Sequence, residues 1–546
     1  MRSSSRNENL PRIGTKFNAK SFGLVVMSIL LGAGIAGCAA GPGTAPGAFA
    51  LSSPENGTGV SLTAELTWTD STGETGYTVE IDDENTFSPP LLHQNTGIAG
   101  GTTSYAIPGG VLAGLAERRT TGYWRATAAN SAGSTIASNA PFSFTVLSSG
   151  ALVPGFGIGG VVTSNPSEGH DVAYAIAIDS TAMYAVGYDY SPGDDQWRIE
   201  KRNLTDGRLV PGFGTGGVVT SDPSEGHDVP WDITIDSTAM YVIGMDRSPG
   251  NYEWRIEKRS LENGSLVPGF GTGGVVTGDY STGDDTAWDI AIDSTAMYVI
   301  GMDYSPGNEQ WRIEKRSLED GSLVPGFGTG GVVTSDPSEG PDHARNIAID
   351  STAMYVIGTD YSPGNEQWRM EKRSLEDGSL VPAFGTGGVV TSNPSGADDE
   401  AYDIAIDSTA MYVVGIDYSP GNEQRRIEKR RLEDGSLVLG FGTGGVVTSD
   451  PSEGDDVIRG IAIDFSAMYV GGYDHSPGNF QWRIEKRSLE DGSLVPGFGT
   501  GGVVTSDPSE GSDIARRIAI DSTAMYVVGG DYSPGNFQWR IEKRVK

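Results

Sequence analysis

The sequence is built on a repeat of 57 residues, and this constrains its fold more than any other feature. The string WRIEKR, or a close variant, begins with Trp at 197, 254, 311, 368, 482 and 539, and Arg425 takes the place of Trp in the fifth copy. Long tandem periods of this kind are typical of solenoids and propellers, in which each unit packs only against its neighbours. A repeat array is therefore expected in place of one compact core.

Each copy divides into four short β-strands. In one copy the expected strands are 288–293, 297–304, 311–318 and 323–335, separated by the turns STA, SPGNEQ and EDG. Pro and Gly in these turns remove an amide donor or supply a positive φ. No window shows a 3.6-residue apolar period, which excludes a helical solenoid. Four strands in each repeat predict a β-propeller blade.

The repeat also resembles a known family. The strings IAID, AMYVIG, EDGSL and FGTGGVV are similar to the bacterial β-propeller repeats called delta-sixty repeats. The resemblance covers all seven copies and implies a propeller. The STA turn departs from the family pattern, which usually has Gly after the Asp. We expect this difference to change only the conformation of that turn.

The order of the strand types along the chain does not begin with the first strand of a repeat. The LVPGFG string occurs seven times, first at 152, and the last copy ends after its third strand. The array thus opens with a lone fourth strand at 152–164. We expect this strand to complete the last blade, which leaves no sheet edge unpaired. The fold class predicted for residues 148–546 is an all-β, seven-bladed β-propeller, closed by pairing of its N-terminal strand with the last blade.

The N-terminus has the pattern of an export signal. Five basic residues precede an apolar run from Phe22 to Cys38, too short for a membrane span of about 20 residues. The string IAGC resembles the lipobox of bacterial lipoproteins, which implies a signal peptide over 1–37 and lipidation of Cys38. Ala39 implies the outer membrane or cell surface. A Gly/Ala/Pro tether over 38–44 follows, and with one Cys in the chain no intramolecular disulfide is available.

Residues 45–147 show alternating strands separated by turn residues, which predicts a β-sandwich. The stretches LTWTD, YTVEI, YWRATAAN and SNAPFSF resemble a fibronectin type III domain. Trp68 and Trp124 are expected in its core. Such domains in exported proteins imply a spacer or an interaction module.

The chain is strongly acidic, with a formal net charge of −33. Such a surface repels phosphate backbones and anionic lipid headgroups. Nucleic acid is therefore excluded as a partner, and membrane attachment is expected only through the lipid. We expect a monomer whose partner is a protein or a glycan.

Differences between the copies gather at one end of the predicted blades. The first-to-second and third-to-fourth turns are nearly uniform, whereas the second-to-third loops and the inter-blade segments diverge, and we call their end the variable end. At the entrance to the innermost strand, one position holds only Trp, Tyr or Arg, the types enriched in binding hot spots. These candidate ligand-binding residues are Tyr174, Trp231, Trp288, Arg345, Tyr402, Arg459 and Arg516. The alternative is that they cover adjacent blade ends, with Arg stems packing as aromatic substitutes.

An invariant Asp lies beside this position in every copy. The seven are Asp171, Asp228, Asp285, Asp342, Asp399, Asp456 and Asp513. We expect them, like Asp179 and Asp189 with their equivalents, to accept turn amides. The alternative is calcium, which takes loop carboxylates and carbonyls, although the spacing of an EF-hand loop is absent. Calcium is therefore the only cofactor considered.

The WRIEKR string should place Arg198, Glu200 and Arg202 on one side of the third strand and form ion-pair ladders. Met297 and its equivalents are expected to fill the core.

The enzymatic alternative depends on four histidines at the variable end, His170, His227, His343 and His475. A propeller hydrolase or lyase would use them with nearby Asp residues as acids and bases. Apart from His170 and His227, which are one repeat apart, they lie at non-matching positions in loops. No nucleophile-elbow, P-loop or zinc-helix motif occurs. The sequence therefore favours a surface binding or scaffold protein without assigned catalytic residues.

Overall fold

The computed structural model describes residues 43–60, 64–118, 121–191, 193–248, 250–305, 307–419, 421–476 and 478–546. The predicted signal peptide, Cys38 and tether residues 38–42 lie outside this part of the chain. Among the described residues, no helix has the length and apolarity needed to cross a membrane.

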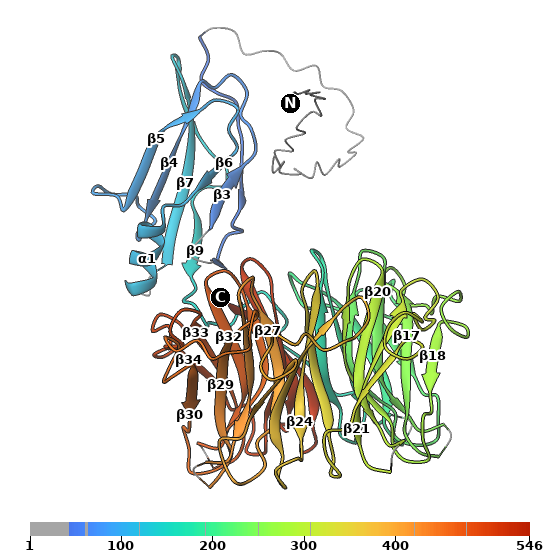
Figure 1. Cartoon of the computed structure of the whole chain (residues 1–546). Helices are drawn as coiled ribbons and strands as arrows, with labels where there is room; N and C mark the ends of the chain where they lie inside the picture. Colours follow the sequence, from blue (N-terminus) through green and yellow to red (C-terminus); the bar gives the residue numbers. More distant parts are fainter. Residues whose placement is uncertain are drawn as a thin grey trace, which may run out of the picture.

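The first unit consists of two sheets around one core (Figure 1). One sheet has the order β1-β3-β6, and the other has the order β2-β9-β7-β4-β5, with β8 paired to β7. The bounds are β1 (Leu51–Ser53), β2 (Thr58–Val60), β3 (Glu65–Trp68), β4 (Gly76–Asp82), β5 (His93–Ala99), β6 (Ser104–Ala106), β7 (Thr121–Asn130), β8 (Gly133–Ile136) and β9 (Phe142–Val146).

Trp68 and Trp124 are 3% and 0% exposed, so both predicted core aromatics are buried. The sequence prediction missed the helix α1 (Gly109–Arg118) between β6 and β7. Leu112 and Leu115 on this helix are buried against the same core, so tertiary packing stabilises a segment that begins with two glycines.

The rest of the described chain forms seven four-stranded antiparallel sheets, a β-propeller-like repeat (Figure 1). The innermost strands are β11 (Val172–Ile178), β15 (Val229–Ile235), β19 (Thr286–Ile292), β23 (His343–Ile349), β27 (Ala401–Ile406), β31 (Val457–Ile463) and β35 (Ile514–Ile520). The second strands are β12 (Ala182–Asp189), β16 (Ala239–Asp246), β20 (Ala296–Asp303), β24 (Ala353–Asp360), β28 (Ala410–Asp417), β32 (Ala467–Asp474) and β36 (Ala524–Asp531). The third strands are β13 (Gln196–Asn203), β17 (Glu253–Ser260), β21 (Gln310–Ser317), β25 (Gln367–Ser374), β29 (Gln424–Arg431), β33 (Gln481–Ser488) and β37 (Gln538–Val545). The outermost strands are β10 (Val161–Ser164), β14 (Val218–Ser221), β18 (Val275–Gly278), β22 (Val332–Ser335), β26 (Val389–Ser392), β30 (Val446–Ser449) and β34 (Val503–Ser506).

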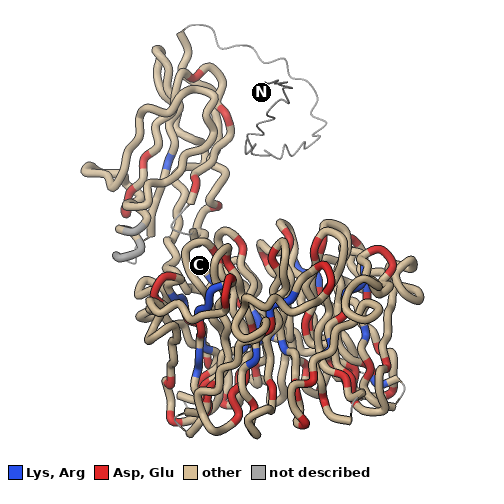
Figure 2. Tube along the Cα trace, in the orientation of Figure 1, with Lys and Arg blue, Asp and Glu red and all other residues tan. Residues whose placement is uncertain are grey.

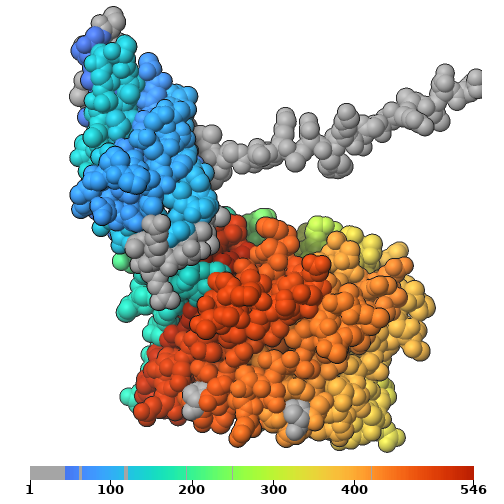
Figure 3. All heavy atoms as spheres, turned by 90° about the vertical axis from the view of Figure 1, so that its left-hand side faces the viewer, coloured from blue at the N-terminus to red at the C-terminus, as the bar shows by residue number. Residues whose placement is uncertain are grey.

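The offset strand lies where the sequence places it. β10 pairs antiparallel with β37, and Val162 lies opposite Ile541 in the register. The innermost strands contact one another in sequence order, and β11 also contacts β35, so the contacts form a cycle. Figure 3 shows this junction, where the early, teal part of the array lies beside the red C-terminal sheet.

The outermost strand is shorter than the sequence predicts. In the copy predicted at 323–335, only Val332–Ser335 is a strand. The preceding residues form a turn in which Gly328 and Gly331 have φ values of 51° and 99°. Phe327 within this turn is fully buried, which fixes the loop against the core.

The WRIEKR strands join neighbouring sheets. Glu200 is fully buried, pairs with Arg198 at 2.8 Å and Arg202 at 2.7 Å, and accepts a hydrogen bond from Ser164 of the preceding sheet. On the other side, Trp197 donates its indole N–H to the carbonyl of Met245 in the next sheet. The predicted ion-pair ladder is therefore present, and buried hydrogen bonds extend it between sheets. Figure 2 shows Lys and Arg along the strands and most Asp and Glu in the loops.

Candidate functional site

A β-bulge occurs near the start of every innermost strand. In β11 the register with β12 shifts between Ala173 and Ala175, so Tyr174 has no cross-strand partner. The same shift recurs in the other six sheets, at the residues equivalent to Tyr174. A bulge re-aims the side chain of its extra residue. The seven candidate residues are therefore the seven bulged residues.

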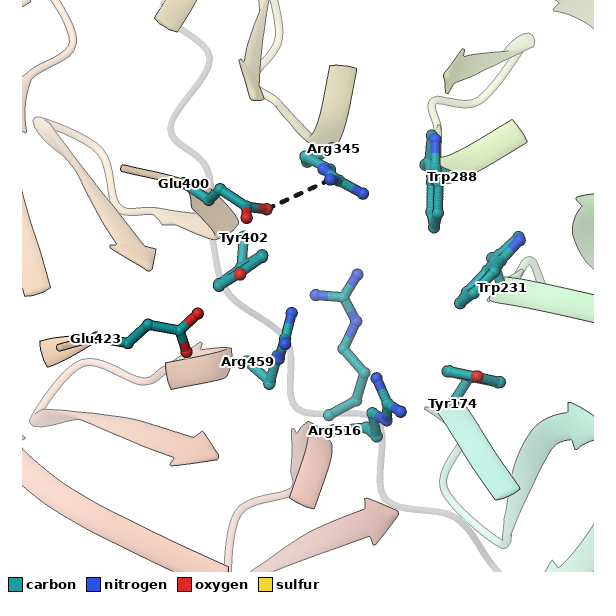
Figure 4. Close-up of a pocket in the computed structure, with 10 residues that line it drawn as sticks. Tyr174, Trp231, Trp288, Arg345, Glu400, Tyr402, Glu423, Arg459 and Arg516 are labelled. Carbon is teal, nitrogen blue, oxygen red and sulfur yellow. Dashed lines mark hydrogen bonds and ion pairs between the residues drawn. The ribbon is translucent and has the colours of Figure 1, made fainter. Parts of the chain in front are cut away.

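The bulged side chains converge on one pocket (Figure 4). Its volume is about 330 Å³, and its lining residues are Tyr174, Trp231, Trp288, Arg345, Glu400, Tyr402, Glu423, Arg459, Arg516 and Arg517. Figure 4 shows the side chains of Tyr174, Trp231 and Trp288 on one side and those of Tyr402, Glu423 and Arg459 on the other. All seven bulged residues are half-buried, which leaves part of each side chain accessible.

Neighbouring bulged residues also pack on one another. The ring centroid of Trp231 lies 4.6 Å from the ring centroid of Tyr174 and 4.5 Å from the ring centroid of Trp288. The guanidinium carbons of Arg345, Arg459 and Arg516 lie 4.9, 4.1 and 4.8 Å from the ring centroids of Trp288, Tyr402 and Tyr174, respectively. Arginine thus packs as an aromatic substitute, as the structural interpretation predicts, while the same side chains line the pocket.

The positive charges of the pocket are not equally paired. Arg345 lies 3.3 Å from Glu400. Arg459 and Arg516 have no carboxylate within 4.0 Å among the described residues, and the only polar side-chain contact of Arg459 is with the hydroxyl of Tyr473, 3.4 Å from its Nη2. The Nε atoms of all three arginines are buried without a hydrogen-bond partner in the described chain. Arg459 and Arg516 therefore bring positive charge to the pocket that no carboxylate of the described chain neutralises.

Charged residues that the sequence analysis did not single out lie directly after the bulges. Arg517 pairs with Asp403 at 2.9 Å and lies 4.0 Å from Asp289. The carboxylate of Asp289 accepts a hydrogen bond from the amide of Ile347 in the next sheet. Burial, and then the neighbouring Asp232, raises the pKa of Asp289 well above its ordinary value. These residues form a polar layer that joins several innermost strands.

One edge of the pocket carries a further charged cluster. His343 contacts Glu309 at 2.5 Å, and Arg345 extends from His343 to Glu400. Burial and the charge of Glu400 raise the pKa of Glu366 to about 7. Glu366 therefore changes charge near neutral pH beside this edge.

The invariant Asp residues have structural partners. Asp171 is fully buried, and its carboxylate accepts hydrogen bonds from the amide and hydroxyl of Ser167 and from the amide of Tyr190. Its six equivalents accept the corresponding bonds. Within the described ranges, no group of three or more His, Cys, Asp or Glu side chains could hold a metal ion. The hydrogen bonds to turn amides and hydroxyls give each invariant Asp the predicted turn role.

The corner Asp179 has a similar role, since it accepts hydrogen bonds from the amides of Thr181 and Ala182 and from the hydroxyl of Tyr184. Burial acts to raise its pKa, but these hydrogen bonds outweigh it and lower the pKa below its ordinary value.

The four histidines do not line the pocket. His170 accepts from the amide of Phe537, His227 lies 2.9 Å from Asp195, and His475 packs against Phe480. His170, His227 and His343 each contact a loop of the preceding sheet, and His475 contacts its own loop. The structure therefore brings together the bulged residues but not the histidines.

Comparison with known proteins gives no family. No protein-family model matches the chain, and no curated protein matches it. Among solved structures, Sqt1 from Chaetomium thermophilum is 12% identical with a TM-score of 0.38, over 69% of this chain and 97% of that one. A glycoside hydrolase is 12% identical with a TM-score of 0.26, over 67% of this chain and 82% of that one. Likenesses of this size carry no argument about function.

Proposed function

We propose that this protein is an exported, lipid-anchored binding protein. In this proposal Cys38 carries the lipid, residues 45–147 form a fibronectin type III-like spacer, and residues 148–546 form a seven-bladed β-propeller that presents a ligand pocket. The ligand is a glycan or a protein segment held by the bulged residues. The observation that carries the proposal is the convergence of seven bulged Trp, Tyr and Arg side chains on one pocket, where Arg459 and Arg516 have no carboxylate partner among the described residues.

The route of the chain supports this arrangement. The amide of Gly150 donates to the carbonyl of Val545, so the first unit leads into the array at the end of β37. The pocket is lined from the beginnings of the innermost strands, at the opposite end of the antiparallel sheets. An anchor before the first unit would therefore hold the pocket away from the membrane.

The test is a glycan array together with a pull-down, using the purified protein and matched variants. Trp231→Ala removes one wall of the pocket. Arg208→Ala is the control, because its side chain is 86% exposed and lies in a third-to-fourth turn at the other end. Saturable binding that Trp231→Ala weakens about tenfold and Arg208→Ala leaves unchanged supports the proposal. Equal binding by both variants contradicts it, and turnover of a hydrolysable glycan would favour the enzymatic alternative.

A further inference from the structure

The pocket is divided into an apolar wall and a charged wall. Tyr174, Trp231 and Trp288 form three adjacent aromatic faces, with interplanar angles of 58° and 43° between neighbours. Rings tilted in this way make a curved surface and not a parallel slot. Such a surface suits the puckered, partly apolar face of a saturated ring better than a flat aromatic ligand.

The charged wall has a surplus of one positive charge. Arg345 is paired with Glu400, and Arg517 is paired with Asp403, so neither contributes a free cation. The remaining charged lining residues are Arg459, Arg516 and Glu423, none of which has an oppositely charged partner within 4.0 Å among the described residues. One bound carboxylate would balance this surplus and give the two guanidinium groups an acceptor.

The carboxylates of the pocket require a different ligand group. Glu400 and Glu423 both line it, and an ionised carboxylate only accepts hydrogen bonds. Glu400 is already paired with Arg345, but a ligand with anionic or aromatic groups alone would leave Glu423 without a donor. Hydroxyl groups would donate to both carboxylates. The cavity of about 330 Å³ is at the lower end of the size range of ligand pockets, so it suits one or two sugar rings.

From these features we infer that the pocket binds an acidic sugar, a pyranose unit that carries one carboxylate and several hydroxyl groups. This inference rests on the proposed function and specifies its ligand. Arg459 and Arg516 bind the carboxylate, Glu400 and Glu423 accept sugar hydroxyls, and the rings of Tyr174, Trp231 and Trp288 cover the apolar face. Inter-blade segments at the variable end are acidic, for example SEGDD at 452–456, and repel extended polyanions, so a single acidic unit at a chain end is preferred.

The test compares probes that differ in one group. Isothermal titration calorimetry with the purified protein uses D-glucuronate and N-acetylneuraminate as acidic sugars, and D-glucose as the neutral match of glucuronate. Benzoate and inorganic phosphate report anion binding without sugar hydroxyls. We expect the acidic sugars to bind at least about tenfold more tightly than the other probes, since charge-assisted hydrogen bonds to the carboxylate are lost with glucose.

Variants locate the effect in the pocket. Arg516→Gln should weaken glucuronate binding by about tenfold, while Arg208→Ala leaves it unchanged. Trp231→Ala should weaken both glucuronate and glucose, by about threefold to tenfold. Its control is Phe465→Ser, because Phe465 is 99% exposed and the six equivalent positions carry Ser. Thermal melts of all four variants show whether each is folded.

The outcomes separate this inference from the proposed function. Glucose, benzoate or phosphate binding as tightly as glucuronate overturns the acidic-sugar inference. Pocket-dependent binding of only a protein or a neutral glycan also overturns it, while the proposed function stands. Absence of any ligand whose binding depends on Trp231 and Arg516 overturns both.

Discussion

Glu253 provides a test of the packing between strands, because it replaces a glutamine that the other six copies share. In those copies the side-chain amide of Gln donates to the Asp at the end of the second strand, over distances of 2.6 to 2.8 Å. Glu253 lies against Asp246, and the two residues are 9% and 0% exposed. An ionised Glu253 has no proton to donate there, so two carboxylates face each other. We predict that Glu253→Gln stabilises the protein.

The magnitude and pH dependence follow from the pKa. Burial, and then the charge of Asp246, raises the pKa of Glu253 from 4.5 to about 7. A raised acid pKa means that the folded state prefers the protonated form, so the wild type loses stability as the pH rises from 4.5 to 7. The full shift corresponds to about 3 kcal/mol, and solvent screening reduces the expected gain for Glu253→Gln to about 1–2 kcal/mol above pH 7.

The assay is denaturant unfolding followed by tryptophan fluorescence at about pH 5, 6, 7 and 8. The difference between Glu253→Gln and the wild type should be smallest at the lowest pH, grow up to pH 7 and then remain constant. The reverse change, Gln310→Glu, should create the same pH-dependent loss in the next sheet. A difference that does not vary with pH, or a variant less stable than the wild type at pH 8, would refute the reasoning.

The remaining predictions concern the array as a whole. Arg425 occupies a Trp position and is 1% exposed, and its Nη2 has no hydrogen-bond partner in the described part of the chain. Burial lowers its pKa to about 10. Arg425→Trp should therefore raise the free energy of unfolding by about 1–3 kcal/mol. Denaturant titration checks this, and a loss of stability would contradict it. Deletion of residues 148–164 should expose the edge of β37, so that amides in 538–545 exchange faster with solvent than those in 481–488. Equal exchange in both segments would show that β10 does not stabilise the last sheet.

Local patterns explain how much of the array could be predicted. In the repeat copy at 288–335, the first three predicted strands begin and end within two residues of the bounds of β19, β20 and β21. Alternation and turn residues act locally, so these strands could be predicted from sequence. The fourth was too long, since Gly328 and Gly331 form a turn there. The helix α1 was missed because its two leading glycines disfavour a helix and its stability comes from Leu112 and Leu115 in the core.

The candidate site was predicted in part. Comparison among the copies identified Tyr174 and its equivalents, because seven copies of one unit show directly which position varies. The adjacent position holds Asp232, Asp289, Asp403 and Arg517 and varies as much, so the same comparison could have found the polar layer. The bulge that aims the first position into the pocket leaves no separate signal in the sequence, since it is a shift in register between two strands.

The sequence by itself determined the period, the strand composition of each unit and the offset that pairs β10 with β37, because these depend on local patterns and on the order of segments along the chain. Only the tertiary structure decided which charges are already paired. Arg345 contacts Glu400 on the neighbouring sheet, and Arg517 contacts Asp403 two sheets away, so both pairs depend on how the sheets are arranged. For the same reason Arg459 and Arg516 have no carboxylate partner among the residues that the structure describes, and the proposed ligand chemistry depends on that difference.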